Sequence, residues 1–500
     1  MFKALMDIGR LLKAGFVLSR HDALVPKEFE EFVPKPVRVL GKISRIGAKD
    51  DGLRPGQRLA RALSGQGPAY VKFGQLLGTR PDIVGFEMAE DLGELQDRMP
   101  PFAQAIAIAE IEKNFDRPLD QIFDDFSPAV AAASVAQVHK AKLKTGEVVA
   151  VKVLRPDVER KVAIEFRAFA RGAAIAERLF KPVRRMEPVT FIETIADSAK
   201  KELDLRMEAG SASEISENLA SEKRVRVPDI KWDFTTKRVL TLEWIDGIKV
   251  TDTEQLEANG IDKVALSHTI MQTFLNQALN DGFFHADMHQ GNLFVDEDGQ
   301  LVLIDFGITG RLDEHSRRIF ADIIYGFIRR DYKAAAAAHF AAGYVPPHHS
   351  VEEFATALRA VVEPIFGRDS ADVDMSKVLQ QLLDTTEKFE MHLRPELIML
   401  QRTMVVMEGV TRALNPTINM WEVAEVVVRR YIDSIAGPKA MAKNAKRSAE
   451  AAFSLATKFP DFAAAAERAV NFVGDDGIKL SSQTVDDLAL AIKRKKKPTR

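Results

Sequence analysis

The sequence predicts an α+β protein of two lobes, with a helical extension at its N-terminus and a helical tail at its C-terminus. Its 500 residues exceed a typical domain of about 100–200 residues, so at least two folding units are expected. Two short strands are expected within residues 141–156, and long helical patterns lie on both sides of them. A small strand-containing unit ahead of a larger helical one predicts a cleft between two lobes.

The composition excludes several classes of protein and site. With 46% hydrophobic and 28% charged residues, the chain has ample material for a core. The formal charge of −2 argues against nucleic-acid binding by the chain as a whole, because such domains are usually strongly basic. The absence of cysteine excludes disulfides, Fe–S clusters, thiolate zinc sites and a cysteine nucleophile.

The first twenty residues predict an amphipathic helix, not a signal peptide, because charges such as Asp7 and Arg10 interrupt any apolar segment. These charges share one helical face, whereas Leu5, Leu12 and Phe16 lie near the other. An ordinary helix packed on its own domain is favoured, and an interfacial membrane helix is the alternative. No apolar run reaches the roughly 18 residues of a membrane-spanning helix, so no span is expected.

The first half of the chain changes from helices to strands. Leu59–Phe115 has an amphipathic helical pattern that prolines interrupt. Within residues 141–156, the turn Lys144–Gly146 joins two strands, of which the second covers the valine-rich segment Val148–Leu154.

The second half is mainly helical. Residues 158–220 are expected to be helical with one break near residues 181–188, and residues 237–250 are strand-like. Beyond residue 252, helices are expected apart from a hairpin over residues 291–308. The chain ends in "KRKKKPTR", which is either a solvated, frayed end, the favoured interpretation, or a segment attracted to anionic lipid.

These patterns divide the chain into four predicted regions. They are a helical extension (1–115), an N-lobe (116–247), a helical C-lobe (248–436) and an amphipathic, basic-ended tail (437–500).

A polar loop ahead of the hairpin has the composition of a phosphoryl-transfer site. Asp287 is followed five residues later by Asn292 and eighteen residues later by Asp305 of an Asp-Phe-Gly sequence. A carboxylate and an amide oxygen at the ends of a hairpin can hold Mg²⁺ against ATP phosphates, and a second carboxylate can orient the nucleophile or accept its proton. These spacings match a protein-kinase catalytic loop. We therefore expect Asp287 to be catalytic and Asn292 and Asp305 to bind the metal ion.

The same loop holds two histidines, His285 and His289, whose spacing of four is that of zinc ligands on a helix. Gly282 and Gly291 bracket a loop and not a helix, so hydrogen bonds that orient the loop are favoured over a zinc site.

A kinase-like fold also requires a lysine in the N-lobe to meet phosphate oxygens. Lys152 lies on the valine-rich strand, and Glu208 on a following helix is its predicted partner. The segment Thr241–Gly247 is then the expected hinge, whose adenine-binding residues would be Glu243, Trp244 and Ile245.

The pattern departs from protein kinases ahead of Lys152. A glycine-rich loop is expected there, but the sequence is "VAAASVAQV", residues 130–138. Each Cβ raises the cost of a positive φ and limits close approach of the backbone to phosphates. Nucleotide should therefore be held differently.

With this departure, the sequence resembles the UbiB family of atypical kinase-like proteins over residues 59–423. The family's motifs occur in order: KxGQ (Lys72–Gln75), a Gln-Asp pair (Gln96–Asp97), an alanine-rich loop, ExD (Glu202–Asp204), the catalytic loop and a C-terminal "LQRTMVVMEGVTRALNP". The resemblance implies that the alanine-rich loop binds ATP through Val130, Ala131, Ala132, Ala133, Ser134, Val135, Ala136, Gln137 and Val138.

The resemblance also implies a gate over the cleft. Lys72 and Gln75 lie three residues apart on one helix and can meet the acidic residues Glu202 and Asp204. Such contacts would obstruct a protein substrate, which favours ATP hydrolysis or action on a small lipid-like partner.

The function implied is that of an ATP- and Mg²⁺-dependent ATPase that supports ubiquinone (coenzyme Q) biosynthesis by handling membrane polyprenyl intermediates. A true kinase for a small molecule or protein, and a non-catalytic nucleotide-binding scaffold, remain alternatives. The implied partners are lipids or polyprenyl-phenol intermediates and other ubiquinone-biosynthesis proteins, without nucleic acid. Members of the family have also been labelled hydroxylases of the ubiquinone ring. The sequence does not support that label, because it has no GxGxxG loop, no haem thiolate and no convincing iron site.

The expected location is peripheral, at the cytoplasmic face of the inner membrane. Family members from related bacteria often end in apolar membrane-spanning helices, whereas the tail of this chain is interrupted by charges.

Overall fold

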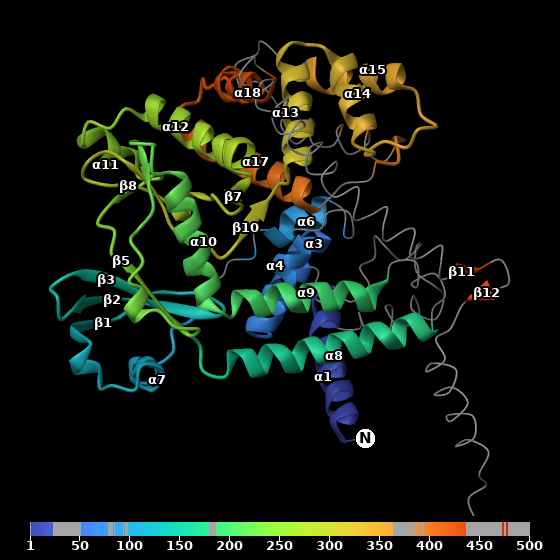
Figure 1. Ribbon diagram of the computed structural model, residues 1–500. Coiled ribbons are helices and arrows are strands. Elements are labelled where there is room, and N and C mark those ends of the chain that lie inside the picture. Colours follow the sequence, from blue (N-terminus) through green and yellow to red (C-terminus); the bar gives the residue numbers. More distant parts are fainter. Residues whose placement is uncertain are drawn as a thin grey trace, which may run out of the picture. The chain divides into compact units, whose positions relative to one another are not determined.

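The computed structural model describes residues 2–23, 52–78, 84, 86–93, 95, 99–179, 187–363, 381, 385, 388–391, 395–436, 473–474 and 477–478. The chain divides into two compact units, residues 1–429 and 430–500, and each is described by itself. The first unit has the predicted α+β, kinase-like architecture with helices at its N-terminus (Figure 1). The finer division into four regions stays a prediction.

Short helices precede the first sheet, as the sequence predicts. They are α1 (Phe2–Arg20), α3 (Pro55–Ser64), α4 (Pro68–Gly78), α6 (Phe86–Gly93) and α7 (Gln104–Phe115). α3 begins at Pro55, four residues before the predicted start, because proline suits the first turn of a helix. α4 is fixed by its aromatic side chains: the ring of Phe73 lies 6.5 Å from that of Phe166 and 5.1 Å from that of Phe169.

The first sheet is antiparallel and has the strand order β1-β2-β3-β5. Its strands are β1 (Phe123–Ala132), β2 (Ala136–Leu143), β3 (Val148–Leu154) and β5 (Val239–Glu243). β2 and β3 confirm the predicted strand pair. In β3 the alternation of a strand buries Val149, Val151 and Val153 in a core with α7, and it directs Lys152 to the opposite face.

β1 was not predicted as a strand. It includes Val130, Ala131 and Ala132, which the sequence placed in a loop, so only residues 133–135 connect β1 to β2. Alanine has a low β-propensity, and here pairing such as Ala131 with Val138 decides the conformation.

The predicted helical stretch after β3 is three helices, α8 (Val158–Leu179), α9 (Pro188–Glu202) and α10 (Leu205–Asn218). α8 and α9 pack side by side (Figure 1). The break after α8 was predicted, whereas the break at Leu203–Asp204 was not. Asp204 causes it, because its carboxylate accepts a hydrogen bond from the backbone N–H of Arg206 and caps α10.

The catalytic hairpin belongs to a second sheet of strand order β4-β9-β8-β6. Its strands are β4 (Val225–Arg226), β6 (Ile248–Lys249), β8 (Leu293–Val295) and β9 (Leu301–Leu303); β7 (Phe283–His285) pairs separately with β10 (Thr309–Arg311). β8 and β9 confirm the predicted hairpin. β4, β7 and β10 have only two or three residues each, too few for a periodic pattern, and were not predicted.

The rest of the first unit is helical. Its helices are α11 (Thr253–Ala258), α12 (Lys263–Asn276), α13 (Glu314–Ile328), α14 (Tyr332–Ala341), α15 (Val351–Val362), α17 (Pro395–Leu414) and most of α18 (Met420–Ala436). α14 and α15 enclose a core that includes Phe354 and Phe389.

Most of the tail lies outside the described residues. Its described part consists of two short strands, β11 (Val473–Gly474) and β12 (Gly477–Ile478), which pair antiparallel. The prediction of a helical tail is therefore wrong at these four residues, which form strands.

Candidate functional site

Lys152 and Glu208 form a buried ion pair between the first sheet and α10. The ammonium nitrogen of Lys152 lies 2.8 Å and 2.9 Å from the two carboxylate oxygens of Glu208. The cap at Asp204 starts α10 one turn before Glu208 and so sets the height at which Glu208 meets β3. The structure thus contains the ion pair that the sequence predicts; its role toward a nucleotide stays a prediction.

The same ammonium group reaches Asp305 of the Asp-Phe-Gly sequence, whose Oδ1 lies 3.3 Å from the Lys152 nitrogen. Asp305 has a φ of +59°, in the left-handed region that non-glycine residues adopt at a cost. Its carboxylate also accepts a 3.4 Å hydrogen bond from the N–H of Gly307. Strain at a metal-ligand candidate, held by contacts to the carboxylate, is typical of a functional position.

Opposite charges fix the protonation states of this group. The Lys152 ammonium, with smaller contributions from His285 and Lys72, lowers the pKa of Asp305 to about 2 and outweighs the opposing effect of desolvation. Burial disfavours the ammonium of Lys152, but Asp305 and Glu208 outweigh it and raise the pKa of that lysine. Burial raises the pKa of Glu208, and Lys152 opposes this shift. The ammonium group of Lys152 therefore forms ion pairs with two carboxylates, and Asp305 is fully ionised at neutral pH.

The catalytic loop is held by its own polar side chains. Asn292 donates its side-chain N–H to the carbonyl of Asp287 over 2.9 Å. His285 is fully buried; its Nδ1 accepts the backbone N–H of Asp287 at 3.1 Å, and its Nε2 lies 3.0 Å from the carbonyl oxygen of Ile304. Burial lowers the pKa of His285, while the negative charges of Asp287 and Asp305 oppose the shift. His285 therefore joins the loop of Asp287 to the strand that leads into Asp305.

The histidines do not form a zinc site. Nδ1 of His289 accepts the N–H of Gly291 at 2.9 Å, and its Nε2 is 3.9 Å from a carboxylate oxygen of Asp287. Among the described residues, the cluster with metal-ligand geometry lies elsewhere and includes neither His285 nor His289. The loop-orienting interpretation of both histidines is confirmed.

The oxygen atoms at this site fit a magnesium ion. The hydrogen bond of Asn292 uses its amide nitrogen, and its oxygen is the atom that Mg²⁺ would bind. The carboxylate of Asp305 is half-exposed and ionised, as a hard-cation ligand must be.

α4 brings a second lysine to the same group. Lys72 is buried and forms an ion pair with Glu202 at the end of α9, and its charge acts on Asp305. The predicted contact between the KxGQ and ExD motifs is therefore present for this pair.

The other two predicted gating residues have different partners. Gln75 donates its side-chain N–H to the carbonyl of Leu95 over 3.3 Å. Asp204 forms an ion pair with Arg206 at 2.7 Å. The expectation that Gln75 and Asp204 take part in the contact is wrong, because the cap of α10 holds Asp204 and α4 turns Gln75 toward the segment after α6.

The alanine-rich segment is fastened to the sheet. Arg155, just after β3, donates two hydrogen bonds of 3.0 Å and 2.8 Å to the carbonyl of Ala133. The side chains of Ser134 and Ala136 are buried, so nucleotide contacts there would come from the backbone. Gln137 is buried, and its side-chain oxygen accepts the N–H of Phe102 at 2.9 Å. The predicted role of Gln137 in ATP binding stays a prediction, and any contact would come from its backbone.

The hinge is extended, and part of its hydrogen-bonding capacity is used. The N–H of Glu243 donates to Asp229 over 2.8 Å, and that of Trp244 to Val148 over 3.1 Å. The carboxylate of Glu243 pairs with Arg226 at 2.9 Å. An adenine would therefore have to use other backbone groups of residues 243–245.

Two residues of α17, Arg402 and Thr403, were not predicted as part of the site. Burial lowers the pKa of Arg402, and the negative charge of Asp287, the predicted catalytic residue, opposes the shift. Its neighbour Thr403 donates a 3.0 Å hydrogen bond to the carbonyl of Ala286. Both lie in the "LQRTM" segment, where polar residues within an apolar helix were the available signal. Gln96 and Asp97 lie outside the described residues.

Comparisons with known proteins agree with this geometry. Residues 94–339 match the ABC1 atypical kinase-like domain, and residues 358–419 match the UbiB helical domain. A relative from Marinobacter nauticus, named "Probable protein kinase UbiB", is 39% identical over 397 residues, which cover 78% of this chain and 73% of the relative. The solved complex of Rv3197 with erythromycin, from Mycobacterium tuberculosis, is similar with a TM-score of 0.50 and 21% identity, over 79% of this chain and 98% of that chain. At that identity the likeness concerns the fold alone.

Replacing Lys152 by methionine should destabilise the protein by about 3–5 kcal/mol at pH 7, because Glu208 would remain as an uncompensated buried charge. A carboxyl whose pKa is raised in the folded state binds its proton more tightly there than in the unfolded chain. The loss should therefore shrink as pH falls toward the ordinary glutamate value of 4.5. Urea unfolding at several pH values measures both effects.

Lys200→Met is the matched control, because Lys200 pairs with Asp197 at the surface of α9 with both side chains more than half exposed. It should cost less than about 1 kcal/mol. An equal loss in both variants, or a Lys152→Met deficit that grows on acidification, contradicts the assignment.

Proposed function

The chain belongs to the UbiB family of atypical kinase-like proteins, as its motifs predict, and we propose that it binds Mg²⁺-ATP and hydrolyses it in support of ubiquinone biosynthesis. The observation that carries this proposal is the ionised Asp305, held by Lys152 and joined through His285 to the loop of Asp287. A nucleotide-binding scaffold without chemistry would have no need of a strained, ionised carboxylate beside a catalytic loop.

Each residue has a separate task in the proposed reaction. Lys152 binds phosphate oxygens of ATP, and Asn292 and Asp305 hold Mg²⁺, which would neutralise charge on the transferring phosphoryl group. Asp287 orients the attacking water and accepts its proton as the bond to the ADP oxygen breaks.

Lys72 supports hydrolysis, or transfer to a small lipid-like acceptor, over phosphorylation of a protein. Its buried pair with Glu202 places α4 beside the metal-ligand candidate Asp305. A polypeptide that approached Asp305 from this side would have to displace α4 and separate a buried ion pair, which is costly.

Asp287→Asn should lower Mg²⁺-dependent ATP turnover of the purified full-length protein by about 10²–10⁴-fold, because an amide cannot accept the proton of the nucleophile. Phosphate release is measured with Mg²⁺ and with excess chelator. Asp298→Asn is the control, since it makes the same substitution at an exposed position in the turn of the same hairpin and should leave turnover unchanged.

Three results would change the proposal. Turnover that survives Asp287→Asn removes the assigned catalytic residue. Radiolabelled phosphate that appears on an added phenol, lipid or protein identifies a kinase. Tight nucleotide binding by the wild type without turnover identifies a scaffold.

Lys72→Ala should lower the Mg²⁺ concentration at half-maximal turnover by several-fold. The substitution removes a positive charge that acts on Asp305 and leaves Glu202 uncompensated, so the site becomes more attractive to a cation. In Lys72→Ala/Glu202→Gln the local charge balance is restored, and the Mg²⁺ requirement should return toward that of the wild type. Lys200→Ala, on the exposed face of α9, is the control. If Lys72→Ala leaves the Mg²⁺ requirement unchanged, Lys72 of α4 does not influence metal binding at the site.

Contact with a membrane is the second part of the proposal, and the orientation of α1 supports it. The charged face of α1 packs inward: Asp7 is fully buried and forms hydrogen bonds of 3.1 Å and 3.2 Å with Arg167 of α8. The apolar residues Leu5, Leu12 and Phe16 are 62%, 71% and 64% exposed. α1 thus packs on its own domain, as the favoured interpretation expects, but it leaves this apolar face exposed, and the exposed face supports the interfacial alternative.

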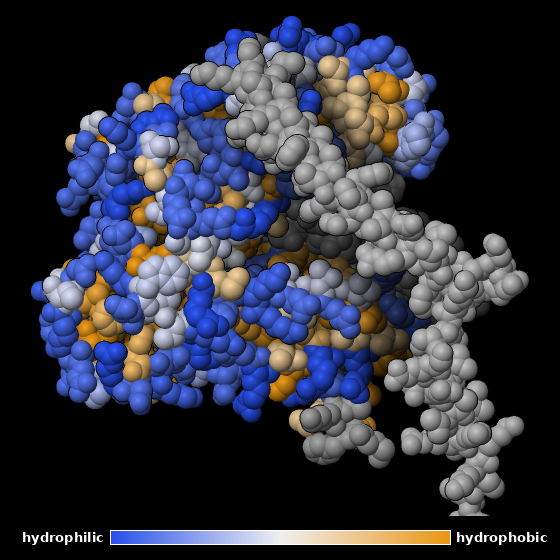
Figure 2. All heavy atoms as spheres, in the orientation of Figure 1, coloured by the Kyte–Doolittle hydropathy of each residue, from blue (hydrophilic) through white to orange (hydrophobic). Residues whose placement is uncertain are grey.

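The surroundings of α1 suit contact with a lipid surface. Figure 2 shows hydrophobic atoms exposed among hydrophilic ones where Figure 1 places α8 and α1. Ile175 and Leu179 of α8 are among the exposed apolar residues. Within the described part of the chain, no helix has the length and apolarity to cross a bilayer.

Leu12→Glu/Phe16→Glu should weaken binding to phospholipid vesicles by at least about tenfold, because two apolar side chains would no longer enter the interface. Sedimentation with vesicles that contain anionic lipid measures the binding. Val264→Glu on α12 is the control, since it adds the same charge at an apolar residue that is 50% exposed. Equal vesicle binding by all three proteins excludes α1 as the contact.

A further inference from the structure

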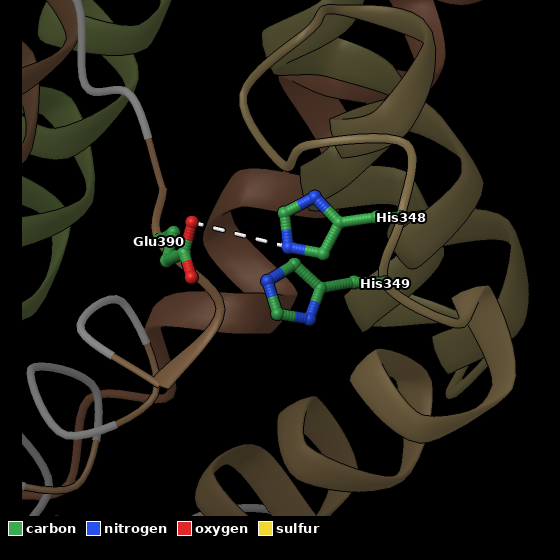
Figure 3. A group of neighbouring side chains, drawn as sticks. All are labelled: His348, His349 and Glu390. Atoms are coloured by element: carbon green, nitrogen blue, oxygen red, sulfur yellow. Dashed lines mark ion pairs between the residues drawn. The ribbon is translucent and has the colours of Figure 1, made fainter.

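We infer that His348, His349 and Glu390 form a binding site for a divalent transition-metal ion, with Zn²⁺ as its test ion. The two histidines lie in the loop between α14 and α15, and Glu390 lies in the short segment 388–391 that faces this loop (Figure 3). One ligand atom from each residue lies within 4.8 Å of the other two. The cluster is independent of the catalytic cleft and of the proposed ATPase.

The geometry requires only a small contraction to bind the ion. Nε2 of His348 is 3.9 Å from a carboxylate oxygen of Glu390. Ligand atoms of a tetrahedral zinc site are about 3.3 Å apart, given metal–ligand bonds of about 2.0–2.2 Å. His348 and Glu390 are exposed, so rotation of their side chains can supply the difference. A water molecule would complete the set of four ligands.

The site rests on a rigid base. The ring of His349 packs against Phe389 at 5.3 Å, and Phe389 packs against Phe354 in a buried core at 4.9 Å. Two prolines precede the histidines, and Ser350, directly after them, caps α15 by accepting the N–H of Glu353. The histidine pair and the backbone next to Glu390 are therefore anchored before any ion binds.

Two further observations indicate a ligand. Nε2 of His349 is buried and, among the described residues, has no hydrogen-bond partner, although a buried polar atom normally has one. Glu390 has a φ of +47°, a strained conformation for a non-glycine residue that turns its carboxylate toward the histidines. A metal ion would satisfy the nitrogen and draw both histidines to the carboxylate.

The ligand types select the ion. Two neutral imidazoles and one carboxylate favour borderline metals such as Zn²⁺, Ni²⁺ or Cu²⁺ over Mg²⁺ and Ca²⁺, which prefer oxygen ligands. The ion would tie the loop after the ABC1 match to the segment that precedes α17 in the UbiB helical match. It would thus join the linker between the two matched regions to the second of them, and it is assigned a structural role.

Zinc uptake by the full-length protein tests the site. Protein treated with a chelator and then freed of it is titrated with Zn²⁺ by calorimetry in excess Mg²⁺, which occupies the carboxylates of the catalytic cleft. The wild type should bind one ion, and His348→Ala, His349→Ala and Glu390→Gln should each weaken that binding at least tenfold. The wild type should gain thermal stability with Zn²⁺, and the three cluster variants should gain less at the same Zn²⁺ concentration, because the ion binds only the folded state.

His315→Ala is the control, since this histidine is exposed on α13 and lies outside the cluster. It should bind Zn²⁺ like the wild type. A cooperative thermal unfolding transition without Zn²⁺ shows that each variant is folded. The inference is overturned if the wild type takes up no Zn²⁺ in the micromolar range, or if the three cluster variants bind it as tightly as His315→Ala.

Discussion

The ammonium group of Lys152 is the interaction on which the cleft depends. It joins β3 to Glu208 of α10 and to Asp305 at the end of the catalytic hairpin, three parts of the chain that lie far apart in sequence. Without it, two neighbouring carboxylates would face each other in a water-poor site, and at least one would take up a proton. Only an ionised Asp305 can bind a metal ion, so the same charge that closes the fold also prepares the chemistry.

Lys72 adds a second positive charge to this group, from a helix outside the kinase-like core. Together, Lys152 and Lys72 place two positive charges among the carboxylates of Glu208, Asp305 and Glu202. An ordinary kinase leaves room beside its metal ions for a polypeptide, whereas here a helix of the N-terminal extension contributes to the potential at Asp305. The alanine-rich segment is a second difference from ordinary kinases. Arg155 holds that segment to the sheet, so a bound nucleotide would meet a fixed edge in place of a mobile glycine-rich loop.

Features set by short stretches of sequence were predictable, and features set by distant partners were not. The valine alternation that orients Lys152, the hairpin of Asp305 and the spacing of Asp287 and Asn292 are local, and the structure contains each of them. The orientation of the Gln137 side chain could not be predicted, because it depends on a hydrogen bond from Phe102, thirty-five residues away. Nor could Arg402, whose relation to Asp287 depends on how α17 packs. The exposure of the apolar face of α1 could not be predicted either, because periodicity shows that a helix has two faces and not which one is covered.

The orientation of α1 also gives the cleft a physical connection to the surface that this helix presents. Asp7 fixes α1 to Arg167 on α8, and the rings of Phe166 and Phe169, on either side of that arginine, pack against Phe73 of α4. Phe73 is the immediate neighbour of Lys72. A lipid surface that binds the exposed face of α1 would therefore act on one end of a chain of packed side chains whose other end is the Lys72–Glu202 pair. Because that pair is buried and close to Asp305, a small displacement of α4 changes the charge at the proposed metal site, and no large movement of the lobes is needed.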